Sequence, residues 1–478
     1  MKEHRKTKNL LLLSLLIPTV AFAAPKDIHG KVTCDGKGLS GVVVTDGIDC
    51  VTTGADGSYT LEGKRGVRHV YVSTPSGYTV ECRDTTVPQF YQPYDYDAPK
   101  ESYDFELIKN PLDNGKHIFT VQADAQMTSE GEIAEYSDFL KDHDEFLKPY
   151  RGKVDIFGLD AGDIVGDSPH LYPLYIEATK QTEMPIYRAM GNHDMTHGGR
   201  TFEYSYKTIE DYFGPIYYSF NKGKAHYIIL DNCFYVNRDY QYIGYIDERT
   251  FNWLEQDLSY VPKDHLVFIN MHIPASDVPE IKWNDLNSNE VVNIRGLISL
   301  LEGRKAHLIT GHTHYNHNVI YSDDLMEHNT AAVCGIWWKA DICCDGTPRG
   351  FGFYEVDGDN VKWIYKSTGY PADYQLRAYP AGSVKEYPSD IIANVWNYDD
   401  LWKVEWLEDG KVMGQMEKFT GLDPETVVRC ADREKMVYAW AKAEKTHHLF
   451  RATPVNPSAK MEVRVTDRFG NVYTQKIK

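Results

Sequence analysis

Apolar and polar residues alternate in short runs along the N-terminal part of the chain. From residue 27 to about residue 107 the alternation has a period of two, which predicts half-buried β-strands. Asp-Gly pairs at 46–47 and 56–57 separate these runs and predict tight turns. The segment is therefore predicted to form a small β-sandwich, a fold that by itself indicates no activity.

Between residue 117 and about residue 366 the pattern changes, because apolar runs now alternate with stretches of helical spacing. That spacing predicts helices at 132–147, 248–258 and 290–301. Strands that alternate with helices predict an α/β layered domain. The buried strands are predicted at 118–123, 154–159, 186–190, 225–230, 266–270 and 306–310.

After about residue 373 the two-residue period returns and predicts a second β-sandwich. Turn-forming residues at 408–410 and 469–471 predict two hairpins. The strands are predicted at 403–407, 437–443, 449–452, 461–466 and 472–476.

Composition and charge narrow the class of protein. The 478 residues suggest about three domains, and 13% aromatic residues exclude a mainly disordered chain. A formal net charge of −18 argues against a protein that coats long nucleic acids, because phosphate backbones require a basic surface. An anionic substrate would need a local reversal of this negative charge.

The first residues have the layout of a secretory signal peptide. Basic residues precede an apolar run at 10–17, and the small-residue stretch Ala21-Phe22-Ala23 marks a cleavage site. The apolar stretch 10–24 has 15 residues, fewer than the roughly 20 that span a bilayer. We therefore predict an exported protein, periplasmic or secreted, with no transmembrane segment.

The chain contains eight cysteines but no Cys-x-x-Cys pair, which argues against a thiolate zinc site. Export permits disulfides. The sequence leaves two alternatives open: one bridge among Cys34, Cys50 and Cys82, or buried free thiols. It also leaves open whether Cys343 and Cys344 bridge each other.

Polar clusters follow five of the predicted central strands at their carboxyl ends. In open α/β folds ligands bind at these ends, so the clusters are expected to converge. Carboxylates, amides and imidazoles suit hard or borderline divalent metals, and two ions about 3.5–4 Å apart can clamp a phosphoryl group. The clusters are Asp124, Gly162-Asp163, Gly191-Asn192-His193-Asp194, His272 and Gly311-His312-Thr313-His314.

These blocks resemble, in order, the motifs of the calcineurin-like metallophosphoesterase superfamily over residues 117–366. With a β module on each side, the chain is similar to an exported bacterial branch of that superfamily. The first module also resembles carboxypeptidase-regulatory-like and adhesin B-type modules. The resemblance implies a layered α/β-β-α core flanked by two small β-sandwich domains. The predicted parts are a signal peptide (1–23), an N-terminal β-sandwich (24–109), the metallophosphoesterase domain (110–370) and a C-terminal β-sandwich (371–478).

The resemblance also implies two divalent metal ions: manganese, iron, zinc or magnesium. Asp163 would bridge them, His193 would act as general acid or phosphate stabiliser, and Asp194 would orient the His193 ring. The remaining ligands would be Asp124 and His314 at the first ion, and Asn192, His272 and His312 at the second.

The sequence departs from the family pattern at two positions. Gln126 stands where the family usually has a ligating histidine, and we expect its amide oxygen to coordinate the first ion. Gly166 stands where the purple subgroup has a ligating tyrosine, so no iron–tyrosinate centre is expected. Two further expectations lie outside the ligand set: Asp167 caps the following helix, and Trp337-Trp338 belong to the core.

Taken together, the sequence predicts an exported dinuclear-metal phosphoesterase that hydrolyses small phosphate esters by attack of a metal-bound hydroxide. One alternative is a phosphodiesterase acting on glycerophosphodiesters or lipid headgroups. A second is a non-catalytic protein that binds carbohydrate or a cell surface through its β-sandwich domains. Loops at 195–206, 232–246, 275–289 and 328–349 are expected to select the substrate.

Overall fold

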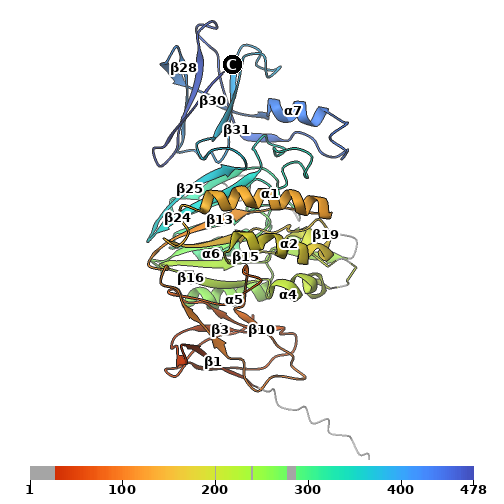
Figure 1. Cartoon of the computed structure of the whole chain (residues 1–478), viewed down its shortest axis with the longest axis vertical. Coiled ribbons are helices and arrows are strands. Elements are labelled where there is room, and N and C mark those ends of the chain that lie inside the picture. The colour runs from red at the N-terminus through yellow and green to blue at the C-terminus, as the bar shows by residue number, and fades with distance from the viewer. Residues whose placement is uncertain (1–26, 197, 200, 238–240, 277–286, 478) are drawn as a thin grey trace, which may run out of the picture.

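The computed structural model describes residues 27–196, 198–199, 201–237, 241–276 and 287–477. The predicted signal peptide at 1–23 lies outside this range. Three parts follow one another along the long axis of the molecule: an N-terminal group of strands, a central layered domain and a C-terminal group of strands (Figure 1).

The N-terminal strands form two small sheets, and β1 buries every second residue as its period predicts. One sheet contains β1 (Ile28–Cys34), β2 (Lys37–Gly38), β5 (Ser58–Leu61) and β11 (Phe105–Glu106). The other contains β3 (Val43–Thr45), β4 (Cys50–Thr52), β6 (His69–Ser73) and β10 (Tyr91–Pro93). Two short pairs complete this part: β7 (Tyr78–Thr79) with β12 (Ile108–Lys109), and β8 (Cys82–Arg83) with β9 (Val87–Pro88).

The central domain contains two facing sheets and confirms the predicted α/β class. The first has the order β15-β14-β13-β24-β25, and the second β16-β17-β20-β21-β23-β22. The first comprises β13 (Lys116–Gln122), β14 (Asp155–Asp160), β15 (Ile186–Arg188), β24 (Gly350–Asp357) and β25 (Asn360–Ser367). The second comprises β16 (Tyr218–Lys222), β17 (Ala225–Ile229), β20 (Leu266–Asn270), β21 (Ala306–Thr310), β22 (His317–Ser322) and β23 (Leu325–Asn329). β18 (Cys233–Asn237) and β19 (Gln241–Gly244) form a separate hairpin.

Aromatic side chains fill the space between the two central sheets. Phe119 on β13 contacts Phe268 on β20 edge to face, with ring centroids 5.1 Å apart. Tyr227 on β17 stacks on Phe268 at 4.9 Å and meets Phe157 on β14 edge to face at 5.0 Å. These rings are buried, and they hold the strand ends of both sheets at a fixed spacing.

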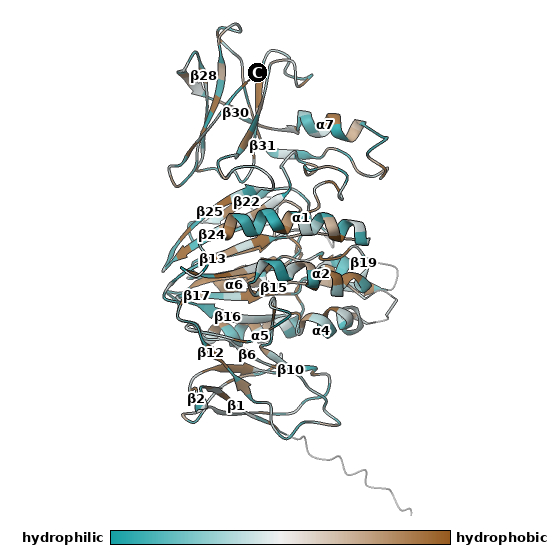
Figure 2. Cartoon of the chain, in the orientation of Figure 1, coloured by the Kyte–Doolittle hydropathy of each residue, from teal (hydrophilic) through white to brown (hydrophobic). Residues whose placement is uncertain are grey.

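Helices cover the outer faces of the sandwich. His143 of α1 (Glu130–Leu147) packs on Phe351 of the first sheet, and Asp257 of α5 (Glu248–Ser259) contacts His226 of the second. The other helices are α2 (Tyr172–Thr179), α3 (Phe202–Ser205), α4 (Lys207–Phe213) and α6 (Ile294–Leu301), with 3₁₀ turns η1 (Pro169–Leu171), η2 (Lys180–Thr182) and η3 (Asn192–Asp194). Figure 2 shows hydrophobic residues along the central strands and hydrophilic residues on the outer side of α1.

The C-terminal part packs two four-stranded sheets around an apolar core of its own, which includes Val404, Phe450 and Val463. The first sheet contains β26 (Leu376–Tyr379), β27 (Ile391–Val395), β30 (Glu417–Leu422) and β31 (Lys445–Ala452). The second contains β28 (Lys403–Glu408), β29 (Lys411–Gln415), β32 (Met461–Thr466) and β33 (Val472–Lys476). α7 (Pro424–Ala431) follows β30.

The strand predicted at 437–443 is wrong, because these residues lie in an irregular segment. Met436 and Ala441 are buried there in a small cluster with Ile336 and Ile342 of the central domain. The apolar residues of the segment therefore pack the C-terminal part against the central domain, and no neighbouring strand pairs with the segment.

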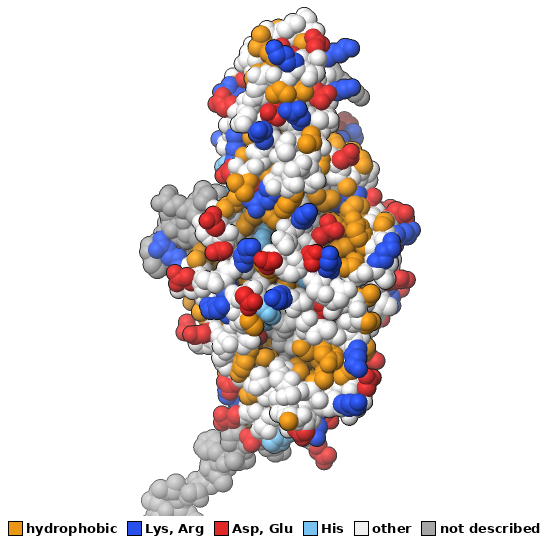
Figure 3. Space-filling view, turned by 90° about the vertical axis from the view of Figure 1, so that its left-hand side faces the viewer, with side chains coloured by type: hydrophobic (Ala, Val, Ile, Leu, Met, Phe, Trp, Pro, Cys, Tyr) orange, Lys and Arg blue, Asp and Glu red, His pale blue; other side chains and the backbone are white. Residues whose placement is uncertain are grey.

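All eight cysteines are free thiols in the structure, so it contains no bridge among Cys34, Cys50 and Cys82 and none between Cys343 and Cys344. Within the described ranges no helix has the length and apolar character needed to cross a membrane. On the face shown in Figure 3, acidic and basic side chains are interspersed, and hydrophobic side chains gather in small groups between them.

Candidate metal centre

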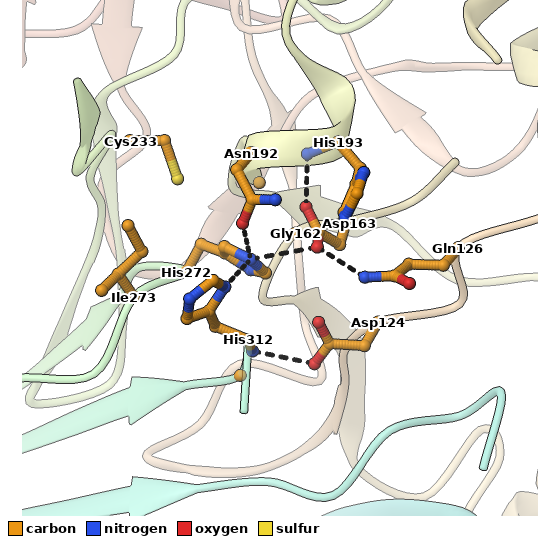
Figure 4. A network of polar contacts seen from close by, with 12 residues as sticks. Asp124, Gln126, Gly162, Asp163, Asn192, His193, Cys233, His272, Ile273 and His312 are labelled. Carbon is orange, nitrogen blue, oxygen red and sulfur yellow. Dashed lines mark hydrogen bonds and ion pairs between the residues drawn. The ribbon is translucent and has the colours of Figure 1, made fainter. Parts of the chain in front are cut away.

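The five polar clusters of the sequence meet at the carboxyl ends of β13, β14, β15, β20 and β21 (Figure 4). The first three strands are parallel neighbours in one sheet, and β20 and β21 are parallel neighbours in the other. Because the two sheets face each other, their carboxyl ends bring all five loops to one edge of the sandwich. Topology alone thus assembles side chains that lie up to 190 positions apart in the sequence.

The backbone of the centre is strained. Residues other than glycine rarely adopt positive φ angles, and such angles cluster at functional sites. In this centre φ is positive at five side-chain-bearing positions, which are Asp124 (55°), Gln126 (40°), Asp163 (54°), His312 (72°) and His314 (58°). The surrounding structure therefore holds these side chains in place at a conformational cost.

Two glycines make the turns of the centre fit together. Gly162 has a φ of 94°, which favours glycine before Asp163. Gly191 is required for a different reason: a Cβ there would lie 2.1 Å from the amide nitrogen of Asp163. The turn after β15 thus packs directly on the turn after β14.

Three groups with lone pairs converge on His272. Its Nδ1 lies 2.8 Å from the carbonyl oxygen of Ala161 and donates to it, so Nε2 points into the centre and can act as an acceptor when the ring is neutral. Burial would lower the pKa of His272, but the neighbouring Asp163 carboxylate raises it to about 9. Nε2 lies 3.3 Å from Oδ2 of Asp163, 3.1 Å from Oδ1 of Asn192 and 3.2 Å from Nδ1 of His312. Ligand atoms of Asp163, His272 and His312 all lie within 4.8 Å of one another.

Asp124 and His314 lie beside this group. Oδ2 of Asp124 accepts the backbone N–H of His312 (2.9 Å), and its Oδ1 lies 3.5 Å from Nε2 of His314. Oδ1 is buried and has no hydrogen-bond partner among the described residues. Such an orphaned carboxylate oxygen is costly unless a cation or a proton neutralises it. The donor set of oxygen and imidazole nitrogen therefore fits divalent metal ions.

Gln126 lies between Asp163 and Trp337. Its Nε2 donates to Oδ2 of Asp163 (2.7 Å), and its Oε1 accepts the indole N–H of Trp337 (2.8 Å). The oxygen expected to coordinate a metal is thus engaged by an indole. In this structure Gln126 links Trp337 to Asp163, and its coordination of a metal stays a prediction.

His193 occupies the open side of the centre, where its side chain is 37% exposed. Its backbone N–H donates to Oδ1 of Asp163 (2.8 Å), and its ring Nδ1 lies 3.0 Å from Oδ2 of Asp167. The prediction that Asp167 caps the following helix is wrong, since η1 has Ser168 as its N-cap residue and no side-chain cap. Asp167 is the carboxylate on the His193 ring.

The predicted partner of that ring, Asp194, has a different function. Its carboxylate accepts the backbone N–H groups of Gly191 (2.9 Å), Ile164 (3.2 Å) and Val165 (3.2 Å), and the hydroxyl of Tyr172 (3.0 Å). These contacts join the turns after β14 and β15. The prediction that Asp194 orients His193 is therefore wrong.

The ionisation of the centre follows from burial and neighbouring charge. Burial would lower the pKa of His193, but Asp163 and the hydrogen bond to Asp167 raise it to about 9. Burial, together with nearby Asp163, raises the pKa of Asp124 to about 8. Burial also lowers the pKa of His312 to about 3, which leaves this ring neutral and able to act as a ligand.

A cleft of about 1010 Å³ opens on the centre. Three of the four loops predicted to select substrate contribute to its lining: Tyr242, Ser276 with Asn287 and Asn289, and Trp337. Residues 277–286 of the third loop lie outside the described residues. Of the predicted core pair, Trp338 is buried, whereas Trp337 lines the cleft. The sequence did not indicate that residues of the C-terminal part, including Trp440 and Lys445, also line it.

Comparison with known families gives three consecutive matches along the chain. Residues 117–316 match the calcineurin-like phosphoesterase model. Residues 26–110 match the model for the N terminal of calcineurin-like phosphoesterase, and residues 327–473 match that for the C terminal. No curated protein matches the chain.

Solved structures resemble the chain at low sequence identity. A dimetal phosphatase from Danio rerio is 14% identical with a TM-score of 0.39, covering 54% of this chain and 97% of its own. The purple acid phosphatase PPD1 from yellow lupin (Lupinus luteus) is 12% identical with a TM-score of 0.40, covering 69% of this chain and 67% of its own. GAP50, the anchor in the inner membrane complex of Plasmodium, is 16% identical with a TM-score of 0.38, covering 55% and 88%.

Proposed function

The chain belongs to the calcineurin-like phosphoesterase family, and on that basis we propose that it is an exported two-metal hydrolase of small phosphate esters. One observation carries the proposal. Lone pairs of Asp163, Asn192, His272 and His312 converge beside the orphaned carboxylate oxygen of Asp124. Export rests on the signal-peptide pattern at residues 1–23.

The ligands fall into two neighbouring groups, one for each ion. Asp124 and His314 would hold one ion, and Asn192, His272 and His312 the other, with Asp163 between them. When bound, such ions polarise phosphoryl oxygens and lower the pKa of water. Manganese, iron, zinc and magnesium all suit this mixture of oxygen and nitrogen donors.

The protein's own residues supply the proton chemistry. Against the effect of burial, Asp163 and Asp167 raise the pKa of His193 and so favour its protonated form, and Asp167 holds its Nδ1. The Nε2 proton is then available to the leaving-group oxygen of an ester bound in the cleft, as in general acid catalysis. The family's metals and this imidazolium would also reverse the negative sign of the surface locally, so that a protein of charge −18 can accept an anionic ester.

The size of the cleft supports a second candidate substrate class. A volume of about 1010 Å³ exceeds what a small monoester fills, so an ester with two substituents on phosphorus also fits. We therefore propose phosphodiesters, including glycerophosphodiesters and lipid headgroups, as the second candidate substrate class.

Hydrolysis assays test both candidates. The purified protein with added Mn²⁺ is given p-nitrophenyl phosphate and bis-p-nitrophenyl phosphate in parallel, and an EDTA-treated sample and the Asp163→Asn variant are the controls. Turnover that depends on metal and on Asp163 supports the proposal, and the preferred ester decides between the candidates. No turnover of either ester, together with no bound metal by elemental analysis, would refute it.

A further inference from the structure

Building on the proposed function, we propose that Trp440 of the C-terminal domain and Trp337 form a stacking subsite for a ring on the leaving group of the substrate. The subsite would select phosphate esters of ring-bearing alcohols, either sugars or nucleosides. Both classes present a ring face that an indole can cover, and the experiment below separates them.

The two tryptophans connect the cleft wall to the metal centre. The Trp337 ring lies 4.7 Å from the ring of His314, measured between centroids, with an interplanar angle of 30°. Trp440 meets Trp337 edge to face at 4.2 Å and 90°. Both residues line the cleft, and Trp440 is 55% exposed. A phosphate at the centre would thus place its leaving group beside these indoles.

Trp337 is held at this position by strained backbone. Trp337 and Trp338 have φ angles of 44° and 61°, a region that bulky residues avoid. Two indole hydrogen bonds fix the pair: Trp337 to Oε1 of Gln126 and Trp338 to the carbonyl of Ala125, each at 2.8 Å. Strain that the surroundings maintain beside a reactive centre points to a functional constraint on the position of the ring.

Trp440 is also fixed before any ligand arrives. Tyr438 stacks on it at 4.8 Å with an interplanar angle of 18°. The segment is anchored by the buried Met436 and Ala441, and by the backbone N–H of Glu444, which donates to the carbonyl of Cys344 (2.9 Å). A large apolar ring left half exposed on so rigid a support is preorganised for binding, because little entropy is lost when a ligand covers it.

The rest of the cleft is polar and favours a hydroxylated ring over an acyl chain. Side chains with amide, hydroxyl and carboxylate groups line it, and they can exchange hydrogen bonds with ring hydroxyls. They include Tyr242, Ser276, Asn287, Asn289 and Glu290. An indole face with a few polar groups around it is the usual composition of a site that orients a small polar ligand.

The test compares three phosphate esters: glycerol 3-phosphate without a ring, glucose 6-phosphate with a sugar ring, and AMP with a nucleoside. Kinetics are measured for the wild type, Trp440→Ala and Trp440→Phe. Tyr370→Ala is the matched control, because Tyr370 is a 38% exposed aromatic residue that stacks on Tyr374 and does not line the cleft.

We expect Trp440→Ala to raise KM at least 10-fold for the ring substrate that the subsite accepts, with kcat nearly unchanged, in keeping with the usual strength of stacking on an aromatic side chain. Glycerol 3-phosphate should change less than twofold. Trp440→Phe should retain most of the affinity, and Tyr370→Ala should match the wild type. A selective effect on glucose 6-phosphate identifies a sugar site, and one on AMP a nucleoside site.

Equal loss on all three esters, or no change on either ring substrate, would overturn the subsite. Calorimetric titration of glucose 6-phosphate and AMP into metal-loaded wild type and Trp440→Ala separates this from failure of the proposed function. If the wild type hydrolyses no ester yet binds a ring ester at least 10-fold more tightly than Trp440→Ala, the subsite stands and the hydrolase proposal fails. If the wild type binds neither ring ester, the subsite is refuted.

Discussion

Among single residues, Asp163 uses both of its carboxylate oxygens within the centre. Oδ1 accepts the backbone N–H of His193, whereas Oδ2 faces both Gln126 and His272. If this carboxylate bridges two ions, replacing it with the isosteric amide in Asp163→Asn should remove metal from both positions. Elemental analysis should then find less than one ion per chain, with activity reduced to background. The amide oxygen can still accept the His193 N–H, so circular dichroism should be unchanged; retention of two ions would contradict the bridging role.

The second residue-scale prediction separates the two carboxylates near His193. Asp167→Asn removes the charge that holds the ring and should lower kcat about 10-fold or more, whereas His193→Ala should lower it by roughly 10²–10⁴. Both variants should keep their metals and their melting temperature. Unchanged kcat in His193→Ala would exclude this imidazole from proton transfer.

Asp194→Ala should act on stability instead. It leaves three buried backbone N–H groups and the Tyr172 hydroxyl without their acceptor, which should cost about 3 kcal/mol. Denaturant unfolding measures this loss. A stability like that of the wild type, combined with a loss of activity like that of Asp167→Asn, would restore the original assignment of Asp194 to the His193 ring.

These two aspartates also show where sequence reasoning stops. The motif blocks identified which residues would gather, because strand order brings loops at carboxyl ends together. They could not identify which carboxylate meets the His193 ring. That choice depends on the turn after β14, where Asp167 has a φ of 54°, and a local sequence pattern does not predict a positive φ at an aspartate.

At the scale of elements, the prediction concerns the packing of one turn on another. Gly191→Ala would place a Cβ 2.1 Å from both the amide nitrogen and Oδ1 of Asp163. The turn after β15 must then move away from the turn after β14, at a cost of about 3 kcal/mol. Metal content should fall along with stability. Gly198→Ala is the control for backbone strain without a clash, since its Cβ meets no atom within 4 Å and its φ is 89°, whereas Gly191 has a φ of −101°.

Helices and strands were predicted correctly where the pattern of apolar and polar residues followed a single clear signal. The strands at 266–270 and 306–310 are found as β20 and β21 with the predicted bounds, because they are almost wholly buried and mostly apolar. The failure at 437–443 has the opposite cause. Its apolar residues contact the loop that contains Ile336, a long-range contact that the local period cannot reveal. The role of Trp440 was missed for the same reason.

At the scale of the whole molecule, the three parts are coupled unequally. The N-terminal strands share one apolar core with the central domain: Phe90 lies 4.4 Å from Tyr218 between ring centroids, and Thr74 forms a β-bridge with Phe220. The C-terminal part has a separate core, although its Trp396 belongs to the shared one and its Phe469 packs on Trp363 with ring centroids 4.8 Å apart. A small apolar cluster and polar contacts, such as His448 with Asp345 at 3.1 Å, join the C-terminal part to the central domain.

This difference predicts two calorimetric unfolding transitions. The N-terminal and central parts should unfold together, and the C-terminal part separately, because cooperativity follows a shared core. Mn²⁺ should raise only the midpoint temperature of the transition of the N-terminal and central parts, since a ligand present at 100 times its Kd adds about 2.7 kcal/mol to the stability of the folded state.

Phe90→Ala should lower the midpoint of that same metal-dependent transition by several degrees, because it leaves a cavity in the shared core. Val463→Ala, in the C-terminal core, should lower only the other one. If Phe90→Ala instead shifted a third transition that ignores Mn²⁺, the N-terminal sandwich would be an independent domain, and its shared core would not contribute to holding the metal-binding strand ends.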